Sequence, residues 1–405
     1  MSEMHNIESD SWEWVRLGNY ASKIGSGVTP RGGQESYLSS GIPLIRSQNV
    51  HMNEFCEDGL AFISDEQDGI MKGSRVFAGD ILLNITGASI GRVCVVPEEI
   101  CPANVNQHVS IIRVNEHFLP EFVSFYLSTP DFQNSIIEMQ SGATRQALTK
   151  AQIEELTVPL PPLNEQKRIT SMLKEQLADV EKARTSAMEQ LEAAKGLADA
   201  FLREVFKGEE SQEWNQYKLG DICTQDRVIV DPDSDMAKNL TYISLEHVES
   251  GSGRILREPS EILTDEGKST TFAFSINHVL YGKLRPYLNK VATPNFDGRC
   301  TTELIPLKPS NIVKREYLTY ILRRPETVHF AMQDKTGSRM PRADMDELMK
   351  LTVRIPPLSR QVEISTILNE QLSEAQHMSD VLIEQLTVIN QLPATILHKA
   401  FSGQI

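Results

Sequence analysis

The chain has 405 residues, 40% hydrophobic and 23% charged, a composition typical of a globular protein with two or three domains. Its formal net charge of −15 argues against a surface coated with nucleic acid, but not against a local basic patch. Five scattered cysteines without a Cys-x-x-Cys pair favour a reducing, cytoplasmic location over a disulfide framework or zinc site. No signal peptide or membrane-spanning stretch is expected.

Residues 1–160 are expected to form a first globular domain of the α/β (α+β) class. Short apolar runs at 42–45, 81–85 and 109–112, separated by Gly, Pro and Asn, indicate strands, and 119–128 indicates a short helix. Thr149 and Gln152 have the spacing of a capping box, in which each side chain bonds a free backbone N–H of the other residue. A helix should therefore begin there, followed by a strand over 156–160 that ends at a Pro-Pro pair.

Residues 161–210 change to a helical period. Apolar residues alternate in steps of four and three, which predicts one long helix with a coiled-coil seam interrupted by a single polar residue, Arg184. Packing of this stripe on a domain of its own is less favoured, because nothing between 164 and 206 could form that domain. The predicted seam residues are Leu173, Leu177, Val180, Leu191 and Phe201.

The second half of the chain repeats the first. Leu163 of one Pro-Pro-Leu run returns as Leu358 of another, and Phe206 returns as Phe401 at the same offset. A second globular domain is therefore expected at 211–355, including a strand over 304–307 and a helix over 314–323. It should end, like the first, in a capping box (Asp344 with Glu347) and a strand over 351–355.

Residues 356–405 should form the second long helix, with Pro393 kinking or interrupting it near its end. The first helix leads from domain one to domain two, and the second can only return. The two helices should therefore form an antiparallel coiled coil, and the two halves should be related by pseudo-two-fold symmetry. The predicted seam residues of the second helix are Leu368, Leu372, Leu382, Leu386 and Ile389.

Catalytic signatures are missing from the sequence. There is no Asp/Asn-Pro-Pro-Tyr/Phe tetrad of an adenine methyltransferase, no complete phosphate loop, no dinucleotide fingerprint and no His-Glu-x-x-His metal motif. The lone histidines, such as His108, are expected to be structural. A binding protein without catalytic residues or a metal is therefore favoured over an enzyme.

Basic and polar loop residues in both halves suit contact with DNA phosphates and base edges. Between Lys283 and Arg342 the sequence carries twelve basic residues against five acidic ones. Two other interpretations stay open: a solvated basic face that balances the acidic stretch 221–266, and ordinary turn or cap residues. The candidate DNA contacts are Arg31, Arg46, Gln48, Thr86, Thr144 and Arg145 in the first half and Lys283, Arg285, Tyr287, Arg339 and Arg342 in the second.

The order of short motifs along the chain resembles the specificity (S) subunit of type I restriction–modification enzymes. It runs through Leu17-Gly18, Gly79-Asp80-Ile81-Leu82, Asn106-Gln107-His108-Val109 and Gly142-Ala143-Thr144, and then Pro161-Pro162-Leu163-x-Glu165-Gln166. The second half repeats it as Leu219-Gly220, Tyr281-Gly282-Lys283-Leu284-Arg285 and Pro356-Pro357-Leu358-x-x-Gln361, with Arg360 where the first half has Glu165. The resemblance covers essentially the whole chain.

The resemblance implies that each globular domain is a target recognition domain for one half of a bipartite double-stranded DNA target. The helices would set the gap between the half-sites and dock two modification (methyltransferase) subunits, with restriction subunits completing the complex. S-adenosylmethionine, ATP and Mg²⁺ would bind to these partners and no cofactor to this chain. A duplicated protein-binding scaffold without nucleic-acid binding, and a self-sufficient methyltransferase, are the alternatives.

Overall fold

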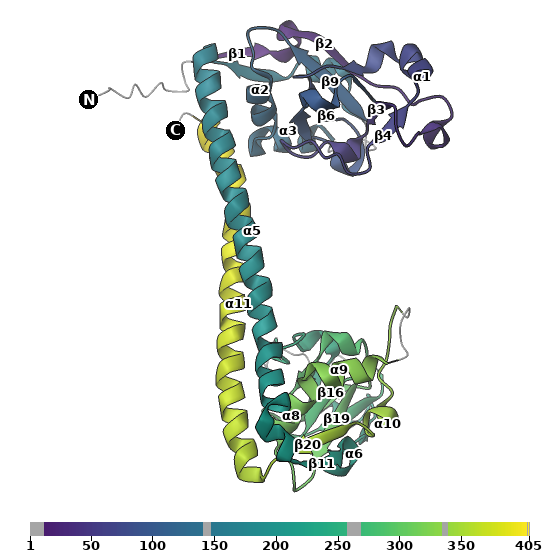
Figure 1. The fold of residues 1–405 in the computed structure, drawn as a ribbon, viewed down its shortest axis with the longest axis vertical. Coiled ribbons are helices and arrows are strands. Elements are labelled where there is room, and N and C mark those ends of the chain that lie inside the picture. The colour runs from purple at the N-terminus through teal and green to yellow at the C-terminus, as the bar shows by residue number, and fades with distance from the viewer. Residues whose placement is uncertain (1–11, 141–146, 257–268, 334–338, 403, 405) are drawn as a thin grey trace, which may run out of the picture. The chain divides into compact units, whose positions relative to one another are not determined.

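The computed structural model describes residues 12–140, 147–256, 269–333, 339–402 and 404. The chain forms two compact units, residues 1–186 with 386–405 and residues 187–385. Each unit holds one globular module and parts of both long helices (Figure 1). The units therefore cut across the predicted boundaries at 160, 210 and 355, because each long helix contributes to both of them.

Module 1, residues 12–160, contains two four-stranded sheets and one strand pair. In the first sheet, β2-β9-β6-β7, all neighbours are antiparallel; in the second, β4-β3-β8-β5, the central pair β3–β8 is parallel. The predicted strands appear as β3, β6 and β9, and the predicted helix as α2. The strands are β1 Glu13–Arg16, β2 Ala21–Ser26, β3 Ile42–Ile45, β4 Ala61–Ile63, β5 Arg75–Val76, β6 Ile81–Asn84, β7 Val93–Val95, β8 Ala103–Val105, β9 Val109–Val114 and β10 Thr157–Leu160, and the helices are α1 Asp65–Ile70, α2 Pro120–Leu127, α3 Pro130–Gln140 and α4 Lys150–Glu154.

Module 2, residues 211–355, repeats this plan. One sheet has the order β12-β19-β16-β17 and the other β13-β15-β18-β14, again with one parallel pair, β14–β18. In each module a first and a last strand pair with each other, β1 with β10 and β11 with β20. The strands are β11 Asn215–Lys218, β12 Cys223–Gln225, β13 Ile229–Val230, β14 Thr241–Ile243, β15 Thr271–Phe274, β16 Val279–Gly282, β17 Val291–Ala292, β18 Gly298–Thr301, β19 Leu304–Pro309 and β20 Thr352–Ile355, and the helices are α6 Leu219–Ile222, α7 Asp235–Asn239, α8 Arg315–Arg323, α9 Pro325–Met332 and α10 Met345–Leu348.

The two predicted capping boxes differ in the structure. At the start of α4, Thr149 accepts from the Gln152 N–H at 3.2 Å and the Gln152 side chain accepts from the Thr149 N–H at 2.9 Å, so this box is complete. At the start of α10, Asp344 accepts from the Glu347 N–H at 3.2 Å, but the Glu347 carboxylate pairs with Lys350. Only the N-cap half of the second box is therefore formed among these side chains.

The long helices α5, Leu163–Lys207, and α11, Leu358–Phe401, pack against each other antiparallel. In the first unit the start of α5 (Leu173) and the end of α11 (Leu397) lie in one core cluster. In the second unit the end of α5 (Leu202) and the start of α11 (Leu368) do the same. The predicted antiparallel pairing is confirmed in both units (Figure 1).

The predicted seam positions lie on the covered side of each helix. Arg184 is the exception: it is exposed and pairs with Glu181 at 2.6 Å, so it does not lie in the buried seam. Its counterpart Ser379 is buried, and its hydroxyl donates to the Ala375 carbonyl at 2.9 Å. The helix α11 runs through Pro393 to Phe401 without interruption. Leu173, Leu368, Leu382 and Ile389 are buried, and Leu177, Val180, Leu191, Phe201, Leu372 and Leu386 are half-buried.

Each module core is completed by the end of the long helix that starts at the other module. In module 1 the Phe401 ring of α11 lies 5.2 Å from the Phe122 ring of α2. In module 2 the Phe206 ring of α5 lies 5.5 Å from the Tyr317 ring of α8. The apolar side of each long helix therefore has two roles. It packs against the other long helix, and its ends also pack into the module cores.

A buried glutamine fixes the start of each long helix to its module. In module 1 the Gln166 carbonyl accepts from the Leu119 N–H at 2.8 Å, and its amide donates to the carbonyls of His117 and Pro161, both at 2.9 Å. The side chain is fully buried and all three of these bonds are made to the backbone.

Gln361 repeats this arrangement in module 2. It accepts from the Lys314 N–H at 2.8 Å and donates to the carbonyls of Ile312 and Pro356, both at 2.9 Å. Each glutamine therefore joins the Pro-Pro turn, the first turn of the long helix and the segment that precedes α2 or α8.

Replacing Gln361 by Leu should lower the free energy of unfolding of the second unit by about 2–5 kcal/mol, because one N–H and two carbonyls lose their buried partner. Denaturant unfolding of the full chain measures the change. Gln391→Leu, at an exposed position of the same helix, is the matched control and should stay within about 0.5 kcal/mol of wild type. Equal unfolding midpoints for Gln361→Leu and wild type would contradict the assignment.

Candidate nucleic-acid interface

Equivalent loops follow β6 in module 1 and β16 in module 2. In module 1 the Leu148 N–H donates to the Ile85 carbonyl at 2.9 Å. In module 2 the Ala343 N–H donates to the Lys283 carbonyl at 2.7 Å. These matching bonds place the predicted contacts around Thr86 and Arg285 at the same point of the two modules.

The second-module loop brings together predicted residues that are far apart in sequence. The Arg285 N–H donates to the Pro341 carbonyl at 2.7 Å, and Leu284 and Arg342 form an antiparallel bridge. Lys283, Arg285 and Tyr287 therefore lie on a segment directly beside the one that carries Arg342. Arg339 lies three residues before Arg342 in the sequence, and its side chain is exposed.

The cationic side chains of this loop pair differ in their availability. Arg342 is engaged with the Glu303 carboxylate at 3.2 Å. Among the described residues, the side chains of Lys283, Arg285 and Arg339 have no hydrogen-bond or ion-pair partner, and Tyr287 is half exposed. This face can therefore offer three cations and an aromatic ring to an anionic ligand.

Two predicted residues of module 1 support the loop that carries them. The Arg46 guanidinium and the Gln48 amide both donate to the Gly59 carbonyl, Gln48 at 3.2 Å. The Arg46 guanidinium also stacks over the Tyr37 ring, 5.3 Å from its centroid. Both side chains thus hold the 46–59 loop in shape, whatever else they contact.

The remaining predicted residues of module 1 fall into two groups. Thr86 shares a hydrogen bond with His108 Nδ1 at 2.6 Å, so its hydroxyl is already engaged within the module. Arg31 is exposed, with no partner for its guanidinium among the described residues. Thr144 and Arg145 lie outside the described residues.

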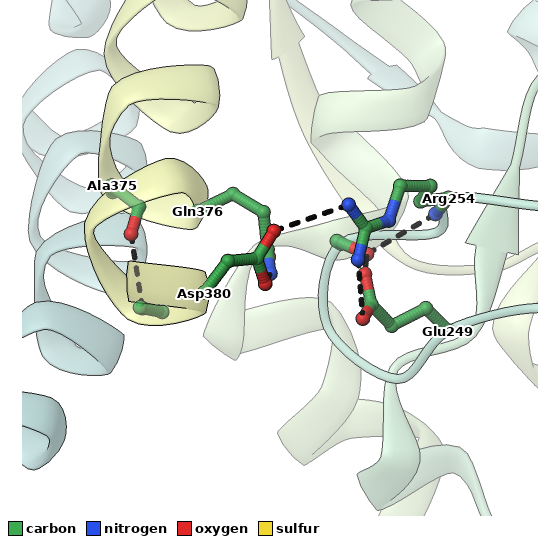
Figure 2. A network of polar contacts seen from close by, with 7 residues as sticks. Glu249, Arg254, Ala375, Gln376 and Asp380 are labelled. Carbon is green, nitrogen blue, oxygen red and sulfur yellow. Dashed lines mark hydrogen bonds and ion pairs between the residues drawn. The ribbon is translucent and has the colours of Figure 1, made fainter. Parts of the chain in front are cut away.

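The sequence did not point to a polar network that joins a module 2 loop to the long helix α11. Arg254 donates to Glu249 at 3.1 Å and to Asp380 at 3.2 Å, and Gln376 also donates to Asp380, at 2.9 Å (Figure 2). The hydrogen bond to Glu249 raises the pKa of Arg254 above its ordinary value. Arg254 is therefore engaged in anchoring its loop, and no local spacing links it to Asp380.

Two of the buried cysteines are not nucleophiles at neutral pH. Burial raises the pKa of the Cys94 and Cys223 thiols to about 12, which keeps them protonated. Within the described part of the chain, no cluster of His, Cys, Asp or Glu could hold a metal ion. None of its helices combines the length and the apolar composition needed to cross a bilayer.

Comparison with known families decides the assignment. The model of the type I restriction modification DNA specificity domain matches residues 10–190 and 211–385, one copy in each half of the chain. The chain belongs to this family. The two copies of the specificity domain correspond to the two modules, each taken with part of a long helix.

Individual relatives are similar over much of their length. The chain is 25% identical to the type I restriction enzyme EcoDI specificity subunit of Escherichia coli over 300 residues, 67% of each chain. It is 20% identical to the StySPI specificity subunit of Salmonella potsdam over 398 residues, 92% of this chain and 83% of that one.

Two solved structures share the fold of this specificity-domain protein. One, from a study of complex assembly and conformational transition of the type I R-M system, has a TM-score of 0.73 at 18% identity and covers 97% of this chain and 98% of that one. The HsdS subunit from Thermoanaerobacter tengcongensis has a TM-score of 0.59 at 20% identity, with 97% of both chains covered.

Arg46→Ala should destabilise module 1 by about 1–2 kcal/mol, because it removes a charged hydrogen bond and a ring contact. Arg31→Ala, whose side chain supports nothing described in the fold, should change stability by less than about 0.5 kcal/mol. Hydrogen exchange of the 46–59 loop and denaturant unfolding measure the two effects. Equal stability of both variants would contradict the structural role of Arg46.

Proposed function

We propose that this chain is the DNA sequence-specificity subunit of a type I restriction–modification complex, and that each module reads one half of a bipartite target. The observation that carries the proposal is the duplication of one specificity-domain module, with equivalent loops after β6 and β16. Two copies of a reader suit a target of two parts. A duplicated scaffold without nucleic-acid binding finds no support in the family.

The proposed DNA contacts differ in whether their side chains are already bonded within the chain. Arg31, Lys283, Arg285 and Arg339 have side chains free for phosphates or base edges. The other proposed contacts are already bonded within the chain, are uncharged, or lie outside the described residues. They are Arg46, Gln48, Thr86, Thr144, Arg145, Tyr287 and Arg342.

The long helices are proposed to set the gap between the half-sites and to dock two modification subunits. Exposed apolar side chains on α11 support a protein-binding role where they gather: Met378 and Val381 line a largely apolar hollow together with Leu197 of α5. S-adenosylmethionine, ATP and Mg²⁺ are proposed to act on the modification and restriction subunits, in the cytoplasm, and this chain to contribute no catalytic residue. The exposed apolar residues are Val362, Ile367, Met378, Val381 and Val388.

The complex of the full chain with its modification subunits should bind one duplex sequence, selected from a random pool, in preference to unrelated duplexes. If six to ten phosphates are contacted, affinity should fall about 10³–10⁵-fold between 50 and 200 mM salt, because cations bound to the DNA are released. Gel shifts over a salt series measure this. A full complex without sequence preference would refute the proposed function.

A further inference from the structure

Three of the described non-glycine residues have a left-handed backbone: Asn53 with φ 57°, Arg285 with φ 51° and Asn289 with φ 48°. L-amino acids other than glycine rarely adopt this conformation, because Cβ approaches the carbonyl oxygen. Each such residue therefore needs a compensating interaction. The matching positions of the other module show which residue adopts this backbone conformation without strain.

The equivalent position in the other module is a glycine in all three cases. The bonds His51 N–H to Glu54 and Glu249 N–H to Arg254 align Asn53 with Gly253. The bonds Asn84 N–H to Arg92 and Gly282 N–H to Lys290 align Gly91 with Asn289. The loops after β6 and β16 align Gly87 with Arg285, and the three glycines have φ values of 69°, 86° and 72°.

The two asparagines are compensated within the chain. The Asn53 amide donates to Ser128 Oγ at 2.8 Å, and the Asn289 amide donates to the Arg323 carbonyl at 2.7 Å. Asparagine is also the non-glycine residue that tolerates the left-handed region best. Their strain therefore has a structural explanation.

Arg285 has no such compensation. Its side chain is exposed, and its guanidinium bonds to none of the described residues. Its backbone N–H bonds to Pro341, and its carbonyl accepts from the Leu288 N–H at 2.9 Å, but a glycine would make both bonds equally well. Unrelieved backbone strain concentrates at functional sites, so the benefit of an arginine here must come from outside the chain.

We propose that Arg285 reads a base edge, that of guanine, in the half-site of module 2; this rests on the proposed function. A guanidinium pairs bidentately with guanine O6 and N7, which demands a fixed starting geometry. The two backbone bonds and the buried Pro286 that follows hold the turn. Phosphate contact needs no such rigidity, since a flexible Lys supplies the charge. Module 1, with Gly87, has no side chain for the same task.

The test compares Arg285→Gly with wild type in the complex with modification subunits. The melting temperature should stay equal or rise by about 2–4 °C, because glycine relieves the strain. Affinity for the selected duplex should fall roughly 10–100-fold, and the preference for guanine should be lost at one position of one half-site. A lower melting temperature, or unchanged affinity and base preference, would overturn the proposal.

Two variants separate base reading from other effects. Arg285→Lys keeps the charge but not the bidentate geometry, so it should lose the base preference; wild-type preference in this variant would identify a phosphate contact and overturn the assignment. Asn289→Gly removes the other left-handed side chain of the same loop, with its bond to the Arg323 carbonyl, and should leave base preference unchanged. A wild-type complex that prefers no sequence would refute the proposed function. If the wild-type complex and the Arg285→Gly complex both keep the guanine preference, only this inference is refuted.

Discussion

The arrangement of each module on its long helix depends on one buried glutamine side chain. Gln166 and Gln361 each satisfy one N–H and two carbonyls at the point where a Pro-Pro turn leads into a helix. Proline supplies no N–H there, and the buried carbonyls need a partner. The glutamine supplies it and fixes the helix direction. Because the partners of each glutamine side chain are all backbone groups, loop sequences elsewhere in the module can change without disturbing the junction.

The cations of the loops are divided between the fold and the surface. Arg46, Arg254 and Arg342 hold loops through a carbonyl or carboxylates. The guanidinium groups of Arg285 and Arg339 have no hydrogen-bond or ion-pair partner among the described residues. An overall charge of −15 gives no measure of this division, since potential at a surface depends on local, unpaired charge. The loops after β6 and β16 share a backbone frame but carry different side chains, which suits readers of different half-sites.

The sequence predicted what depends on local or periodic pattern. The repeat, the long antiparallel helices and the Thr149 box follow from motif spacing and period. The parallel pairing of β3 with β8 and the Arg254–Asp380 bond join distant segments, and no local pattern encodes them. Arg184 was misplaced because a heptad count cannot tell a covered position from one at the edge of the seam. The sequence identified the loops of the candidate site. It did not show which arginines are bonded within the fold and which are available to a ligand.

The shared cores determine the order in which the modules can be completed during synthesis. The core of module 2 draws on Leu202 and Phe206, made before it, and on Leu368 soon after it. The core of module 1 needs Leu397 and Phe401, at the far end of the chain. The first module to leave the ribosome is thus the last to acquire its full core. Until then its exposed apolar surface invites aggregation or chaperone binding.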